Sequence, residues 1–111
     1  QAKTAIDVLR GKGVCDVVIT LGAKGVVSSS GDSTAFWHPL PTKVCDVNGA
    51  GDAFYSGFLS RFTKPGATMD DGVAEGLAMA SLTAETEGTT VWNLTQSAVD
   101  ARAEHAFKKL I

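Results

Sequence analysis

The stretch from Asp46 to Asp52 contains the residues best suited to chemistry. It reads Asp-Val-Asn-Gly-Ala-Gly-Asp, and an apolar run with helical spacing follows at once. Small residues at a loop-to-helix junction let several backbone N–H groups point at one anion, because few Cβ atoms are in the way. A carboxylate beside such a cradle can accept the proton of an alcohol. The stretch therefore predicts phosphoryl transfer to a hydroxyl group, with Asp52 as the catalytic base. The N–H donors of this anion hole belong to Gly49, Ala50, Gly51 and Asp52.

A simpler role for Asp52 is to stabilise the start of the helix. A carboxylate at a helix N-terminus interacts favourably with the helix dipole by about 0.3–1 kcal/mol. A carboxylate that only stabilises a helix N-terminus does not need glycine-rich residues in front of it. The Gly-Ala-Gly sequence in front of Asp52 therefore favours the functional interpretation.

The composition is that of an ordinary globular protein. The 111 residues suffice for one small domain, with 44% hydrophobic and 20% charged residues. Ten Lys and Arg residues against twelve Asp and Glu residues give a net charge of -2, which argues against binding to nucleic acid. No apolar run approaches the roughly 20 residues of a membrane span, and the polar start is unlike a secretory signal. We therefore expect a cytoplasmic protein without nucleic-acid or membrane partners.

The spacing of the cysteines and histidines does not match a known metal site. Cys15 and Cys45 lie in strand-like surroundings without the spacing of a zinc site. We interpret both as reduced residues that pack inside an intracellular protein. His38 and His105 have no partners at ligand spacing and are interpreted as surface or edge residues.

Helical and strand patterns alternate in the first part of the chain. Residues 2–10 have apolar and charged side chains on opposite faces, which predicts a helix. The apolar, β-branched run 16–21 predicts a strand covered on both faces, as in a parallel sheet. A tight turn at 22–25 follows, and the segments 25–29 and 34–38 are predicted to form a hairpin.

Three helices are predicted in the second part, over 51–62, 69–85 and 95–109. Gly72 and Gly76 lie inside the middle helix, where each costs roughly 1 kcal/mol relative to Ala. This cost predicts a close neighbour for the helix, which is either another backbone or a flat ligand. Four aromatic residues are interpreted as core side chains, namely Trp37, Phe54, Phe58 and Phe62.

The pattern indicates an α/β fold whose sheet is incomplete. Even with a further short strand at 43–45, the chain has too few strands for a self-sufficient doubly wound sheet. A truncated sheet exposes an apolar edge and face, so we expect marginal stability or association into a homo-oligomer. The chain does not begin with Met, and we interpret it as a piece of a longer protein.

Two motifs together resemble the ribokinase-like (PfkB) family of carbohydrate and nucleoside kinases. The string from Asp46 to Phe58 resembles the family's C-terminal signature, although Val47 replaces a more usual Thr. The segment from Val17 to Gly25 looks like the strand and turn that border the ATP phosphates in this family. The resemblance covers essentially residues 1–111 as the C-terminal part of the kinase domain, within a three-layer α/β/α fold.

The resemblance implies roles for particular residues. Asp52 matches the catalytic base, and the small residues before it match the anion hole. Several residues match positions that contact ATP, namely Thr20, Gly22 and Gly25 in the turn and Val73, Gly76 and Met79 in the helix that stacks adenine. Mg²⁺ accompanies ATP in such enzymes. A monovalent cation, K⁺, is implied at Asp46, Asn48, Thr83, Thr86 and Gly88, although Trp92 departs from the pattern of members that offer a small hydroxyl there.

The acceptor is a small molecule, either a sugar or a nucleoside. The segment 78–88, followed by Asn93-Leu94-Thr95, is similar to the matching part of pseudouridine kinases. Pseudouridine is therefore the first expectation, ahead of the acceptors of ribokinase, adenosine kinase or another sugar kinase. The missing N-terminal half of the same protein would supply the acceptor site and lid, so we expect the fragment alone to be inactive. The alternative of another class is a catalytically silent module for regulation or oligomerisation.

Overall fold

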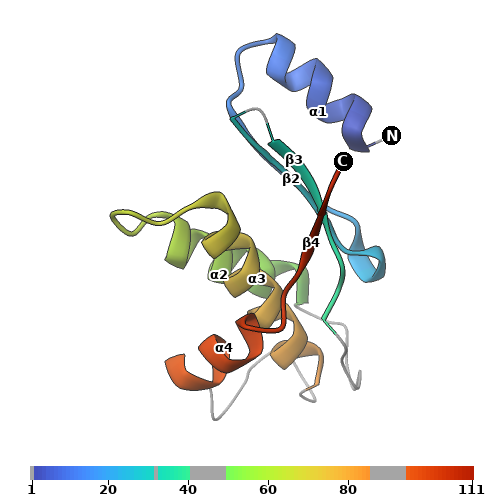
Figure 1. The fold of residues 1–111 in the computed structure, drawn as a ribbon. Helices are drawn as coiled ribbons and strands as arrows, with labels where there is room; N and C mark the ends of the chain where they lie inside the picture. The colour runs from blue at the N-terminus through green and yellow to red at the C-terminus, as the bar shows by residue number, and fades with distance from the viewer. Residues whose placement is uncertain (1, 32, 41–49, 86–94) are drawn as a thin grey trace. The chain divides into compact units, whose positions relative to one another are not determined.

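The computed structural model describes residues 2–31, 33–40, 50–85 and 95–111. The chain divides into two compact units (Figure 1). The first unit comprises residues 1–38 and 107–111, and the second comprises residues 39–106. The strand predicted at 43–45 lies outside the described residues.

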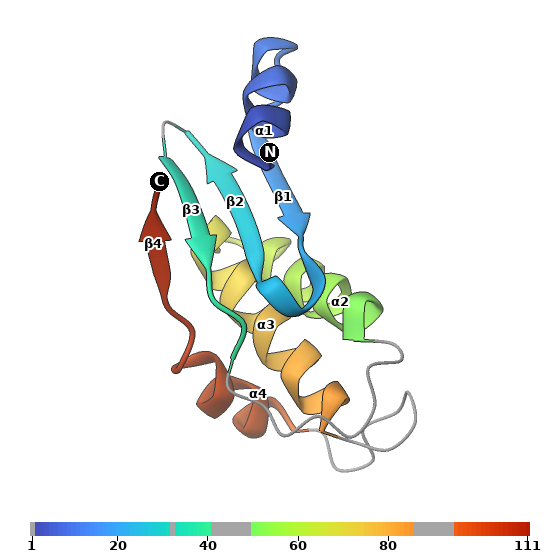
Figure 2. The same cartoon turned by 90° about the vertical axis from the view of Figure 1, so that its right-hand side faces the viewer.

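The first unit contains one helix and a four-stranded sheet. Helix α1 (Ala2–Gly11) precedes strands β1 (Asp16–Thr20), β2 (Val26–Ser30), β3 (Ser33–Trp37) and β4 (Lys108–Leu110), and a short 3₁₀ helix, η1 (Gly22–Lys24), joins β1 to β2. The strand order is β1-β2-β3-β4, and every pair is antiparallel (Figure 2). The predicted hairpin is confirmed. The expectation of a parallel sheet around 16–21 is wrong for the described strands, because the short turn after β1 returns the chain antiparallel along β2.

Helix α1 packs on one face of this sheet. Ile6 has no exposed surface and forms a cluster with Val17 and Val27, which share that face because their strands are in register. Arg10 at the end of α1 donates hydrogen bonds to the hydroxyl of Ser29 at 3.0 Å and to the carbonyl of Gly31. These bonds fix the end of the helix to the β2–β3 turn.

Strand β4 replaces the end of a predicted helix. Helix α4 (Gln96–Ala103) ends well before residue 109, and Lys108 and Lys109 lie in β4 rather than in a last helical turn. Pairing with β3 satisfies backbone groups of both strands, and it outweighs a helix propensity that is only a weak prior. Beyond β4, the N–H of Ile111 donates to the carbonyl of Thr34 at 2.9 Å.

Side chains of the first unit refine the sequence interpretation. Cys15 is exposed, so the expectation that it packs in the interior is wrong; it lies in the loop between α1 and β1. Trp37 is buried as expected, and its indole N–H donates to the Ser28 hydroxyl at 2.9 Å. His38 lies just after β3 and stacks on Phe107 with ring centroids 4.5 Å apart. Cys45 lies outside the described residues.

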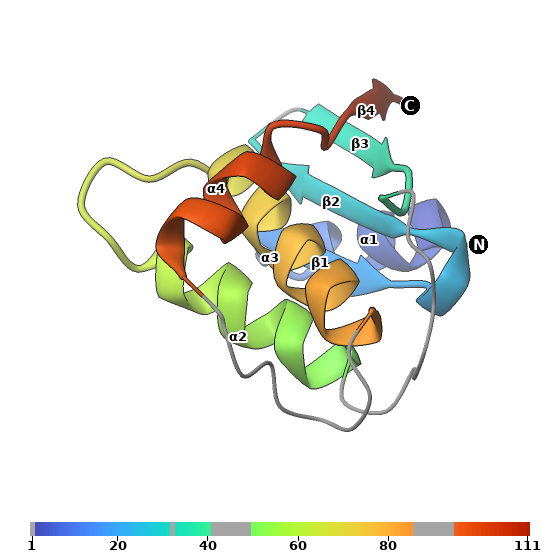
Figure 3. The same ribbon diagram turned by 90° about the horizontal axis from the view of Figure 1, so that it is seen from below.

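The second unit is helical. Helices α2 (Ala50–Phe62) and α3 (Met69–Ala84) agree with their predicted ranges to within one residue, and they pack side by side (Figure 3). Helix α4 packs against α3. The guanidinium of Arg102 on α4 bonds both carboxylate oxygens of Glu85 at 2.9 and 3.0 Å and the hydroxyl of Ser81 at 2.9 Å.

Glycines set the distance between α2 and α3. A Cβ atom at Gly76 would lie 2.8 Å from both the ring and the backbone oxygen of Phe54, and one at Gly72 would lie 2.9 Å from the ring of Phe58. The close neighbour that these glycines predict is therefore helix α2. Phe54 and Phe58 are buried, whereas Phe62 is half-buried.

Among residues 2–31, 33–40, 50–85 and 95–111, no helix is both long enough and apolar enough to cross a bilayer. The expectation of no membrane partner stays a prediction.

Gly76→Ala in the full-length protein is expected to lower the free energy of unfolding by about 1–3 kcal/mol, because the new methyl group would overpack against Phe54. This loss would appear despite a gain in helix propensity of about 1 kcal/mol. Chemical denaturation measures the difference. Gly11→Ala at the end of α1 is the matched control, because its Cβ would meet no atom within 4 Å, and it should be neutral or slightly stabilising. A Gly76→Ala protein as stable as wild type would contradict the glycine-set spacing.

Candidate active site

Asp52 lies in the first turn of α2, and its side chain is exposed. Ala50 and Gly51 occupy the same turn, so three of the four residues of the predicted anion hole begin one helix. The first N–H groups of an α-helix have no acceptor within the helix and carry its positive end. An exposed carboxylate therefore lies in the same turn as N–H donors that have no acceptor within the helix. The fourth residue, Gly49, lies outside the described residues.

Neither the backbone conformation nor any packing contact among the described residues requires glycine at position 51. Its φ angle is not positive, and a Cβ atom there would meet nothing within 4 Å. Helix propensity disfavours glycine by about 1 kcal/mol relative to Ala. The small residue therefore leaves the surface beside Asp52 open, which is what close approach of an anion to the backbone requires.

The predicted phosphate-binding turn lies between β1 and β2. Thr20 is the last residue of β1 and pairs with Val26. Gly22 and Gly25 have φ angles of 61° and 120°, which favour glycine. The N–H of Leu21 donates to the carbonyl of Gly25 at 2.8 Å, which closes the turn. Both glycines thus have a backbone explanation, and their contact with ATP stays a prediction.

The three α3 residues predicted to contact ATP have different surroundings. Val73 has no exposed surface, and Gly76 packs against Phe54. Packing of α2 is therefore sufficient to explain the glycine that we attributed to adenine stacking. Met79 is half-buried and borders a pocket of the helical unit.

Most of the predicted cation site lies outside the described residues. Thr83 is buried on α3, whereas Asp46, Asn48, Thr86 and Gly88 fall in the two segments that are not described. Among the residues that are described, no group of three His, Cys, Asp or Glu side chains is arranged to hold a metal ion. The K⁺ site stays a prediction.

The two units contain different parts of the predicted site. The turn of Thr20, Gly22 and Gly25 belongs to the first unit. The anion hole, Asp52 and the α3 residues belong to the second unit. Within the second unit, the structure brings Ala50, Gly51 and Asp52 into one helical turn.

Sequence reasoning missed one polar residue of the helical unit. Glu75 is 6% exposed, and its carboxylate accepts a hydrogen bond from the side chain of Gln96 at 3.2 Å. The signal was a single acidic residue within an otherwise apolar stretch of α3, from Val73 to Leu77. Charged residues are seldom this deeply buried without a partner.

The family of pfkB carbohydrate kinases matches residues 1–96 of this chain. The chain is 40% identical over 83 residues to the fructoselysine 6-kinase of Escherichia coli, a match that covers 73% of the chain and 30% of that protein. It is 32% identical to the solved nucleoside kinase of Methanocaldococcus jannaschii, with a TM-score of 0.74, covering 84% of this chain and 31% of the other.

A third similar protein is the fructokinase of Vibrio cholerae, solved in a form that binds fructose, ADP and potassium ion. Its identity is 26% and its TM-score 0.77, covering 91% of this chain and 34% of the other. The chain thus spans about a third of the length of these three proteins. The match over residues 1–96 nevertheless shows its family: this chain belongs to the pfkB family of carbohydrate kinases.

Proposed function

We propose that this chain is the catalytic part of an ATP-dependent phosphotransferase whose acceptor is a hydroxyl group of a sugar or a nucleoside. The observation that carries the proposal is the exposed carboxylate of Asp52 in the first turn of α2, next to Gly51. No packing contact among the described residues requires glycine at position 51. The family match and the named acceptors of the three similar proteins support the same reaction class.

The hydroxyl oxygen of the acceptor forms a bond to the γ-phosphorus of ATP, and Asp52 accepts the proton of that hydroxyl. At the same time, the bond between the γ-phosphorus and the oxygen that leaves with ADP breaks. ATP would supply the phosphoryl group, and Mg²⁺ bound with it would neutralise charge on the phosphates. The free N–H groups at the start of α2 hold the transferred group by hydrogen bonds and through the helix dipole. A strong base is not needed, because positioning and charge stabilisation provide most of the rate enhancement in phosphoryl transfer.

The ATP and cation sites belong to the same proposal. In the first unit, Thr20, Gly22 and Gly25 of the turn are proposed to contact the nucleotide, and in the second unit the half-buried Met79 of α3. Val73 and Gly76 are not included, because Val73 has no exposed surface and Gly76 packs against Phe54. K⁺ bound by the fructokinase supports a monovalent cation site in this chain as well.

The acceptor site is proposed to lie in the remainder of the protein. The chain spans 30–34% of the length of the three similar proteins. Residues 1–111 then act as the phosphoryl-transfer side of one kinase domain.

The finer proposal is pseudouridine as the acceptor. It depends on the similarity of segment 78–88 and of Asn93-Leu94-Thr95 to pseudouridine kinases. The three similar proteins are named for fructoselysine, a nucleoside and fructose, so both sugars and nucleosides belong in the test.

Asp52→Asn in the full-length protein is expected to lower kcat by about 10²–10⁴-fold, because the hydroxyl proton loses its acceptor. Folding should not change, since the side chain is exposed. Coupled measurement of ADP release gives the rate, and circular dichroism checks the fold. Asp7→Asn on the exposed face of α1 is the matched control and should keep full activity. Unchanged phosphorylation by Asp52→Asn would remove this residue from the mechanism, and an inactive wild type with every acceptor would favour the silent module.

Gly51→Ala tests the anion hole separately from the base. The methyl group would meet no atom of the described residues within 4 Å, so stability should be equal to or slightly above that of wild type. The kcat/KM for the phosphoryl acceptor should fall about 10- to 100-fold, because the transferred group is displaced. Ser56→Ala, one turn further along α2, controls for substitution in this helix. A fully active Gly51→Ala enzyme would show that nothing approaches the backbone at this position.

Pseudouridine is expected to be turned over with the highest kcat/KM in a panel that also contains ribose, adenosine, fructose and fructoselysine. The panel uses the full-length protein with ATP and Mg²⁺, with and without K⁺. Turnover of ribose or adenosine but not pseudouridine would end the finer proposal and leave the kinase proposal intact.

A further inference from the structure

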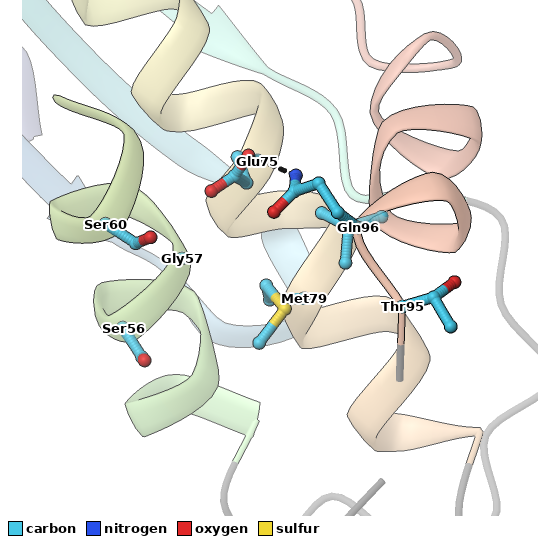
Figure 4. Close-up of a pocket in the computed structure, with 8 residues that line it drawn as sticks. Ser56, Gly57, Ser60, Glu75, Met79, Thr95 and Gln96 are labelled. Atoms are coloured by element: carbon cyan, nitrogen blue, oxygen red, sulfur yellow. Dashed lines mark hydrogen bonds between the residues drawn. The ribbon is translucent and has the colours of Figure 1, made fainter. Parts of the chain in front are cut away.

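A pocket of about 220 Å³ lies within the helical unit, among α2, α3 and α4 (Figure 4). Its walls carry both polar and apolar groups from all three helices, including Ser56, Ser60, Glu75, Met79, Gln96 and Val99. At about 30 Å³ for each water molecule, the pocket has room for about seven, so it fits a ligand of only a few non-hydrogen atoms.

Glu75 is the acidic group of this pocket. Its side chain is more than nine-tenths buried, with 6% of the residue exposed. One oxygen accepts the hydrogen bond from Gln96, and the other turns toward the α2 side of the pocket, where Ser60 lies (Figure 4). In the described part of the chain, the side chain of Gln96 is the one partner recorded for this carboxylate.

A buried carboxylate with a single neutral partner is poorly compensated. Loss of hydration penalises the charged form, and one amide replaces only part of the water that a carboxylate binds. The cation on the neighbouring helix does not serve Glu75, because Arg102 binds Glu85 and Ser81 instead. A positively charged hydrogen-bond donor in the pocket would supply the missing partner.

Other acceptors face the same space. The amide nitrogen of Gln96 donates to Glu75 and, at 2.8 Å, to Asp100, which fixes the orientation of the amide. Its oxygen therefore turns toward the pocket, and the hydroxyl of Ser60 faces the same space from α2 (Figure 4). An ammonium group has three donors and no acceptor, so it matches such a set.

The remaining wall suits an alkyl chain. Met79 and Val99 contribute apolar surface, and Gly57 adds backbone without a side chain. A bare metal ion fits less well, because Glu75 is the one acidic residue among the lining residues and the volume exceeds that of a single ion. The combination favours a short alkyl chain with a charged amine at its end.

We propose that this pocket binds the ammonium group of a small primary alkylamine, with the carboxylate of Glu75 as its counter-ion. The site shares no residue with Asp52 and the anion hole, and of its lining residues Met79 is also among those proposed to contact ATP. The same ammonium chemistry could come from a Lys side chain elsewhere in the full-length protein, and the experiment distinguishes the two sources.

The test is calorimetric titration of the full-length protein with n-butylammonium at low salt, with n-butanol as the neutral molecule of the same shape. Butylammonium should bind in the millimolar range expected of so small a ligand. It should bind at least about tenfold more tightly than butanol, because the ammonium adds the attraction of opposite charges to its hydrogen bond with the Glu75 carboxylate. Equal binding of the two compounds would overturn the proposal.

Glu75→Gln keeps the shape of the side chain and removes its charge, so butylammonium should bind about tenfold or more weakly. Glu104→Gln, an exposed residue at the end of α4, is the matched control and should bind as wild type does. If Glu75→Gln fails to fold, Ser60→Leu leaves the carboxylate in place and should block binding by filling the pocket. Wild-type affinity in Glu75→Gln or in Ser60→Leu would contradict the site.

If the wild-type protein does not bind butylammonium, the proposal that the pocket binds a free alkylamine is wrong. If a Lys side chain of the same protein occupies the pocket, Glu75→Gln would in addition lower the melting temperature. Glu104→Gln would leave it unchanged.

Discussion

The close packing of α2 on α3 is the constraint on which the candidate active site depends. Each helix offers a glycine to a bulky side chain of the other: Gly76 meets Phe54, and Gly57 meets Met79. A Cβ atom at these glycines would come within 2.8 and 2.6 Å of those side chains, so the contact allows one separation of the helices. Asp52 lies two residues before Phe54. The position of the proposed base relative to α3 therefore follows from a contact that involves no charge.

The structure explains some glycines of this chain by packing and others by backbone conformation. Gly76 is needed for packing, and Gly22 and Gly25 are needed for backbone conformation. Gly51 has neither cause among the described residues, although it weakens a helix. Gly11 has neither cause either, but it ends helix α1, whereas Gly51 lies in the first turn of α2 next to the exposed carboxylate of Asp52. This setting, together with the absence of a packing contact, favours a ligand as the reason for Gly51. The same comparison separates Gly51 from Gly76, which sequence analysis alone had attributed to adenine.

Elements set by neighbouring residues could be predicted from the sequence, whereas those set by distant contacts could not. The ends of α1, α2 and α3 were predicted well, because turn residues follow each helix and the apolar spacing inside them is regular. Strand β4 was missed because its stability comes from pairing with β3, far away in the sequence. The place of Asp52 in the first turn of a helix could be predicted from its local motif. The burial of Glu75 could not, because it depends on how three helices meet.

The order of β3 and β4 along the chain has a consequence for how the protein folds. Both strands belong to the first unit, yet all the residues of the second unit lie between them in the sequence. The last ladder of the sheet must therefore close a loop that contains an entire helical unit, and such non-local pairing is slow compared with helix formation. During synthesis, the edge of β3 stays open until the residues of β4 leave the ribosome. The helical unit can form first and shorten the loop, which lowers the entropy cost of completing the sheet.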